Sequence, residues 1–142
     1  MTLPLNADRF WDSLDQMARI GATLDGGVKR LALSPEDDHA RKLLRDWALA
    51  AGCTVTVDRL GSMYCTYPGT DPDAAPVAIG SHLDSVPTGG KYDGPYGVLL
   101  GLEIVRALHA AGRHRAWLRE WAVGLSLIAG IAVGYGTGLI LS

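Results

Sequence analysis

The chain has 142 residues, enough for one domain of modest size. Its net charge of −2 comes from 13 basic and 15 acidic side chains in a mixed pattern, so the composition argues against a nucleic-acid partner. Cys53 and Cys65 match no metal-binding or redox spacing. We therefore expect reduced, buried thiols and no disulfide scaffold.

Two helices are predicted in the first third of the chain. The first covers Asn6–Ile20, where apolar side chains recur at helical spacing, and Gly21–Leu33 follows as a loop. Ser34 can cap a second helix whose first turn holds Pro35 and acidic residues that suit the helix dipole. This helix is expected to end near Ala51. The expected inward-facing positions are apolar in both helices. They are Phe10, Leu14 and Met17 in the first helix and Leu43, Leu44, Trp47 and Ala48 in the second.

Strands are predicted next, followed by a third helix. Thr54–Asp58 and Met63–Tyr67 show strand patterns separated by a turn, which favours a hairpin. Pro68–Pro76 has the composition of a surface loop, and Val77–Gly80 is typical of a buried strand. Gly97–Ala111 is apolar nearly all round and is predicted to be a helix packed against a sheet. Helices that alternate with strands indicate the α/β class.

The C-terminal segment differs in composition from the rest of the chain. Trp121–Ser142 contains no charged side chain. As a helix it would be about 33 Å long, which is comparable to the hydrocarbon core of a membrane. At the other end, acidic and basic residues interrupt any apolar stretch, so we expect no signal peptide and a cytoplasmic location.

The segment Gly80–Val98 holds the residues with the clearest chemistry. His82 and two carboxylates, Asp84 and Asp93, follow the predicted buried strand in a glycine-rich loop. Such side chains at the carboxyl end of a strand suit a metal site, and Asp93 could bridge two cations. A carboxylate near a ligating imidazole can also fix its tautomer. The alternative is that His82 is an ordinary core histidine and that the glycines form only a turn.

Five blocks of the sequence together resemble the pattern of a known enzyme family. They are Arg19-Ile20-Gly21, Gly27-Val28-Lys29-Arg30-Leu31, the Asp38–Ala51 helix, Val57-Asp58-Arg59-Leu60-Gly61 and GSHLDSVPTGGKYDGPYGVLLGLEIVRAL from Gly80 to Leu108. With these blocks, Met1–Gly112 resembles the N-terminal part of the N-carbamoyl-L-amino-acid hydrolase, β-ureidopropionase and allantoate amidohydrolase family. These enzymes belong to the larger group of di-metal aminoacylases and exopeptidases.

The resemblance implies a partial zinc-exopeptidase-like catalytic domain with helices on a mixed sheet. It implies His82 as a ligand to one metal, Asp93 as the ligand that bridges both, and Asp84 as the catalytic-site residue that supports His82. The implied cofactors are two divalent ions, zinc or manganese. The implied reaction is hydrolysis of a small N-carbamoyl (ureido) substrate by metal-activated water, with a Glu as general base.

The chain departs from the family pattern after Gly112. The adjacent glutamates that supply the base and a ligand have no counterpart, since Glu120 stands alone beside Trp121, and the later His ligands and the dimerisation domain are missing. Ser62 also stands where the family usually has Asn. We therefore expect an incomplete metal site and no catalysis by this chain alone. His39 and His109 are poor replacement ligands, because both lie on predicted helices.

The sequence leads to three expected segments: residues 1–112 as hydrolase-like body, 113–121 as basic linker, and 122–142 as a candidate transmembrane helix. The last segment has two main interpretations. It is either a membrane anchor, as in a non-enzymatic protein with a degenerate hydrolase-like body, or a frameshift or fusion junction. A buried core helix is a weaker third interpretation because of the glycine content. The substrate and the metal are not decided by the sequence.

Overall fold

The computed structural model describes residues 3–69, 75–112 and 137–141. Its elements in chain order are α1 (Ala7–Ala18), α2 (Pro35–Ala50), β1 (Thr54–Val57), β2 (Met63–Tyr67), β3 (Val77–Ser81), α3 (Pro95–Ala110) and β4 (Thr137–Leu141). The alternation of helices and strands confirms the α/β class. The three predicted helices are present, and α3 begins two residues earlier than expected because Pro95 occupies its first turn.

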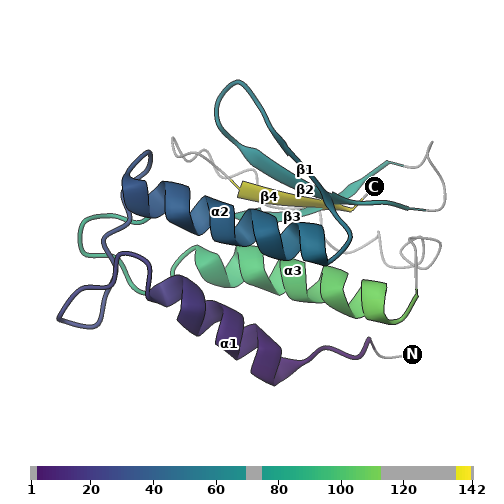
Figure 1. Ribbon diagram of the computed structural model, residues 1–142, viewed down its shortest axis with the longest axis horizontal. Helices are drawn as coiled ribbons and strands as arrows, with labels where there is room; N and C mark the ends of the chain where they lie inside the picture. The colour runs from purple at the N-terminus through teal and green to yellow at the C-terminus, as the bar shows by residue number, and fades with distance from the viewer. Residues whose placement is uncertain (1–2, 70–74, 113–136, 142) are drawn as a thin grey trace.

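The four strands form one sheet in the order β1-β2-β4-β3. β1 and β2 pair antiparallel, with Val55 opposite Cys65, which confirms the predicted hairpin. β4 lies between β2 and β3, parallel to β2 and antiparallel to β3 (Figure 1). The sheet is therefore mixed.

The expected C-terminal helix is not confirmed. Thr137–Leu141, at the end of the segment predicted to be helical, is a strand instead. The physical reason is its position between β2 and β3, where a neighbouring strand on each side can satisfy its backbone N–H and C=O groups. Residues 113–136, with the predicted basic linker and most of the candidate membrane segment, lie outside the described residues. Within the described part of the chain, no helix is both long enough and apolar enough to cross a bilayer.

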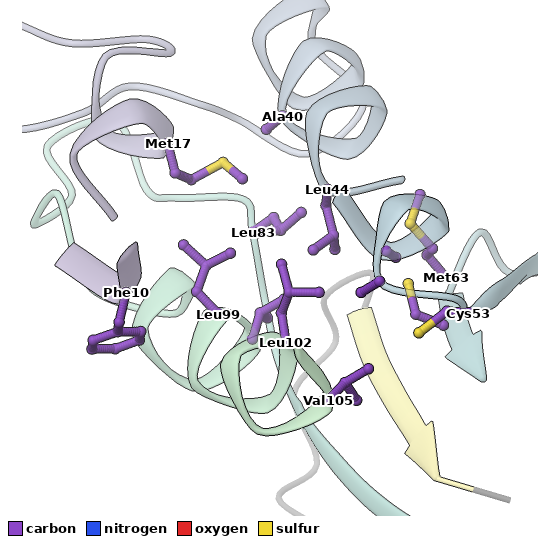
Figure 2. Packing of buried hydrophobic residues seen from close by; sticks show 14 of the residues in the cluster. Phe10, Met17, Ala40, Leu44, Cys53, Met63, Leu83, Leu99, Leu102 and Val105 are labelled. Carbon is purple, nitrogen blue, oxygen red and sulfur yellow. The ribbon is translucent and has the colours of Figure 1, made fainter. Parts of the chain in front are cut away.

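All three helices lie on the same side of the sheet (Figure 1). α2 packs on β1, α3 packs on β3 and β4, and α1 packs on α3. The core between them contains the predicted apolar faces of α1 and α2 and the buried faces of α3 and β2 (Figure 2). Burial raises the pKa of both Cys53 and Cys65 to about 11, and both thiols are free and buried as expected.

β3 is less buried than its apolar sequence predicts. Val77, Ile79 and Ser81 are half-buried, and the two residues between them are exposed. Helix α3 covers one face of β3. In the described part of the chain, β3 pairs only with β4 and therefore lies at an edge of the sheet.

A buried glutamate joins α1 to α3. The side chain of Glu103, in the middle of α3, is only 2% exposed and accepts hydrogen bonds from Arg9 at 2.7 and 2.9 Å and from the Asn6 backbone N–H at 2.8 Å. Arg106 Nη1 lies 4.0 Å from Glu103 and donates to Ser13 Oγ. Sequence reasoning treated α3 as an apolar helix and missed this ionic link.

Candidate functional site

The candidate site lies between the end of β3 and the start of α3. Ser81 is the last residue of β3, and His82 follows it directly. The chain then forms a loop through Asp84 and Asp93, and Gly94 precedes the first turn of α3. The three predicted site residues therefore lie in a loop whose two ends are fixed by β3 and α3.

His82 and Asp84 are in contact, although β3 ends before them. His82 Nδ1 lies 2.9 Å from the backbone carbonyl oxygen of Asp84 and 3.5 Å from Asp84 Oδ1. A carbonyl can only accept, so the neutral imidazole carries its hydrogen on Nδ1. Nε2 is then the nitrogen with a free lone pair, and this arrangement is typical of a histidine that binds a metal ion.

Gly94 brings the Asp93 end of the loop against His82. A Cβ atom on Gly94 would lie 2.5 Å from His82 Cε1, Nδ1 and the His82 carbonyl oxygen, closer than van der Waals contact allows. Gly94 also has a φ of 83°, a left-handed conformation that favours glycine. Asp93 directly precedes Gly94 and is exposed. Glycine at position 94 therefore lets the turn that follows Asp93 pack against His82.

Arg30 and Ser85, which are both buried, fix the middle of this loop by hydrogen bonds. Arg30 is fully buried, and its Nε donates to the Leu83 carbonyl at 2.6 Å. The backbone N–H of Arg30 donates to Ser85 Oγ, and the Ser85 N–H donates to the Arg30 carbonyl. The Leu83 side chain is 1% exposed and points into the core (Figure 2). Sequence reasoning missed Arg30 as a site residue, because an arginine in a loop is ordinarily solvent-exposed.

Aromatic and charged side chains support the outer part of the loop. The hydroxyl of Tyr92 donates to Asp15 on α1 at 3.1 Å, and its ring packs edge-on against Trp11. Lys91 Nζ lies 4.7 Å from the centre of the Tyr92 ring. These contacts give Tyr92 a structural role in the loop and place Lys91 against its ring.

The described residues do not by themselves complete a metal centre. No group of three or more His, Cys, Asp or Glu side chains in the described part of the chain could hold a metal ion. Structural zinc takes four ligands, and a catalytic zinc takes three from the protein. His82 and Asp93 offer two. His109 packs on the Tyr67 ring at the far end of α3.

The structure also contains an open cavity of about 530 Å³ away from His82. It lies where the end of α1 meets the start of α2. Its lining combines polar and apolar side chains: Gln16, Arg19, Ile20, Gly21, Pro35, Glu36, His39 and Leu43. His39 is therefore separated from the loop of predicted site residues.

The chain is similar to several known proteins, although no model of a protein family matches it. It is 50% identical over 120 residues to the N-carbamoyl-L-amino-acid amidohydrolase of Rhizobium meliloti, covering 82% of this chain and 29% of that protein. Over most of its length, the chain is thus a homologue of this amidohydrolase. A ureidoglycolate hydrolase of Arabidopsis thaliana is 31% identical over 111 residues, covering 78% of this chain and 23% of that protein.

The fold of the amidohydrolase family is shared as well. A hydantoinase/carbamoylase family amidase from Burkholderia multivorans superposes with a TM-score of 0.79 at 42% identity, covering 98% of this chain and 29% of that one. The chain thus spans less than a third of the length of the relatives it matches. The resemblance that the sequence blocks predicted is confirmed.

Proposed function

We propose that this chain forms the part of a metal-dependent amidohydrolase that supplies His82 and Asp93 as metal ligands. Asp84 orients His82 in this proposal. The observation that carries it is the contact of His82 Nδ1 with the Asp84 carbonyl, which leaves the lone pair of Nε2 for a metal ion. A bound divalent cation would polarise a substrate carbonyl and lower the pKa of a water molecule.

The proposed substrates are small molecules with a ureido group. The names of the relatives, N-carbamoyl-L-amino-acid amidohydrolase and ureidoglycolate hydrolase, share this group. The higher identity to the former favours N-carbamoyl amino acids. We further propose that the 142-residue chain alone does not turn over these substrates, because two ligands are too few to hold a catalytic metal ion. Its cytoplasmic location stays a prediction.

A chimera tests the proposed roles of the site residues. Residues 1–112 would replace the matching part of the Rhizobium meliloti relative, and hydrolysis of an N-carbamoyl amino acid would be measured with added Zn²⁺ or Mn²⁺. We expect an active chimera that His82→Ala or Asp93→Ala weakens by at least about 100-fold. Asp84→Asn should cost about 10- to 100-fold, because it removes the negative charge that lies 3.5 Å from His82 Nδ1, while the backbone carbonyl contact and the ligand remain.

His39→Ala serves as the matched control, since His39 lies on α2 and lines the separate cavity. It should leave activity unchanged. A chimera that is active and indifferent to His82→Ala would refute the assigned role. In a parallel assay, turnover by the unmodified 142-residue chain that His82→Ala abolishes would show that this chain does complete a catalytic site.

A further inference from the structure

Among the described residues, no carboxylate lies at hydrogen-bonding distance from the buried positive charge of Arg30. Its guanidinium group donates to three backbone carbonyls: Leu83 through Nε, and Met17 and Ile20 through Nη1 at 3.0 and 2.8 Å. Met17 and Ile20 belong to the last turn of α1 and the residues just after it. One side chain therefore ties the end of α1 to the loop that contains His82.

The backbone of Arg30 fixes a second part of the same loop. Its carbonyl accepts from the Ser85 N–H at 2.7 Å. The Ser85 N–H and the Asp84 C=O belong to one planar trans peptide, in which the two bonds point in opposite directions. When the N–H points to Arg30, the Asp84 carbonyl points away from it, and it is this carbonyl that meets His82 Nδ1.

Electrostatic attraction between Arg30 and Asp84 also acts on this loop. Arg30 Nη2 and Asp84 Oδ1 are buried and have no hydrogen-bond partner among the described residues. Burial lowers the pKa of Arg30, and the negative charges of Asp37 and Asp84 act in the opposite direction. The charges of Arg30 and Asp84 therefore attract each other at this loop.

We propose that Arg30 is a positioning residue that fixes the two peptide groups flanking Asp84 and thereby holds the His82 imidazole in the Nδ1–H tautomer. The functional meaning of this tautomer rests on the proposed role of His82 as a metal ligand, whereas the tautomer itself is a property of the metal-free chain. The forked shape of the guanidinium is needed for this role, because Nε binds the Leu83 carbonyl while Nη1 binds the carbonyls at the end of α1.

The test is nitrogen NMR of the histidine side chains in the complete 142-residue chain without metal, at a pH where the imidazoles are neutral. His82→Gln assigns the His82 signals by their loss. In the unmodified chain, Nδ1 of His82 should carry the hydrogen, which is the form that histidine in water disfavours. Arg30→Met should shift the population toward Nε2–H, because the Leu83 carbonyl loses its donor and Asp84 loses the nearby charge.

Arg106→Met is the matched control. Arg106 is also largely buried, and it donates to Ser13 and lies over Trp47, away from the loop. It should leave the His82 tautomer unchanged. A folded Arg30→Met chain with the tautomer of the unmodified chain would overturn the proposal, as would an equal shift in Arg106→Met.

Arg30→Lys keeps the test decisive if Arg30→Met does not fold. Lysine preserves the charge but has no planar fork, so we expect a partial shift of the tautomer population toward Nε2–H. A folded Arg30→Lys chain without any shift would also overturn the proposal. Failure of the chimera assay would instead refute the proposed amidohydrolase role and leave the tautomer result intact.

Discussion

Glu103 in the helical layer and Arg30 beneath the site loop are both buried charges, but the molecule compensates them differently. Glu103 is paired with two arginines, so opposite charges and hydrogen bonds join α1 to α3. In the part of the chain that the structure describes, the side chain of Arg30 donates only to carbonyl oxygens. Paired charges stabilise the packing of helices, whereas the carbonyl-bound arginine fixes the path of a loop. We therefore expect the first region to control stability and the second to control the site.

Among the variants that compare these two regions, the largest effect is expected from Gly94→Ala. The added methyl group would collide with the His82 ring, and displacement of a ligand by about 1 Å can cost on the order of 100-fold in activity. The activity of the chimera measures this loss. Gly26→Ala is the matched control, because Gly26 has nearly the same φ, 85° against 83°, and no atom of the described residues lies within 4 Å of the added Cβ. It should cost about 1 kcal/mol of stability and no activity.

The outcome of this pair separates steric displacement from backbone strain. Equal activity losses in Gly94→Ala and Gly26→Ala would mean that strain in the turn, and not contact with His82, controls the site. That result would also remove the reason for treating the loop as a region distinct from the rest of the fold.

A smaller effect, on stability alone, is expected from Glu103→Ala. It leaves Arg106 without its buried carboxylate partner, and we expect a loss of about 2–3 kcal/mol in the free energy of unfolding, reduced from the fully buried case because Arg9 is 40% exposed. Urea denaturation measures it. Asp38→Ala removes the exposed ion pair with Lys42 and should cost less than about 0.5 kcal/mol. Similar losses in both variants would contradict the distinction between buried and exposed pairs.

The smallest effect is a pH dependence of the Glu103 contribution. Burial works to raise the pKa of Glu103, but the hydrogen bonds from Arg9 and Asn6 and the charges of Arg9 and Arg106 outweigh it, so the pKa is lowered. A carboxyl with a lowered folded-state pKa stabilises fully above its unfolded value of about 4.3 and loses that contribution as the pH falls through the folded value.

Denaturation of the unmodified chain and of Glu103→Gln at several pH values tests this sign. The stability difference between them should be constant near neutral pH and should shrink below about pH 4.3. A difference that grows with acidity would mean that Glu103 is not held ionised by its arginine partners.

Much of the local structure was predictable from the sequence. The apolar spacing of α1 and α2, the hydroxyl of Ser34 at the start of α2 and the alternation in β1 and β2 were all found as expected, because these signals depend on neighbours within a few residues. The His82-Leu83-Asp84 and Tyr92-Asp93-Gly94 patterns led to the correct family. Their roles as metal ligands stay predictions until the chimera is assayed.

The tertiary structure alone decided three further features: the burial of Arg30, the pairing of Glu103 with Arg9, and the place of β4 between β2 and β3. Each joins residues far apart in the sequence; Arg30 and Leu83 are separated by 53 positions and Arg9 and Glu103 by 94. Periodicity describes only which face of its own element a side chain occupies. Whether a charge is buried, and whether an apolar segment becomes a strand, depends on the partners that the folded chain brings to it.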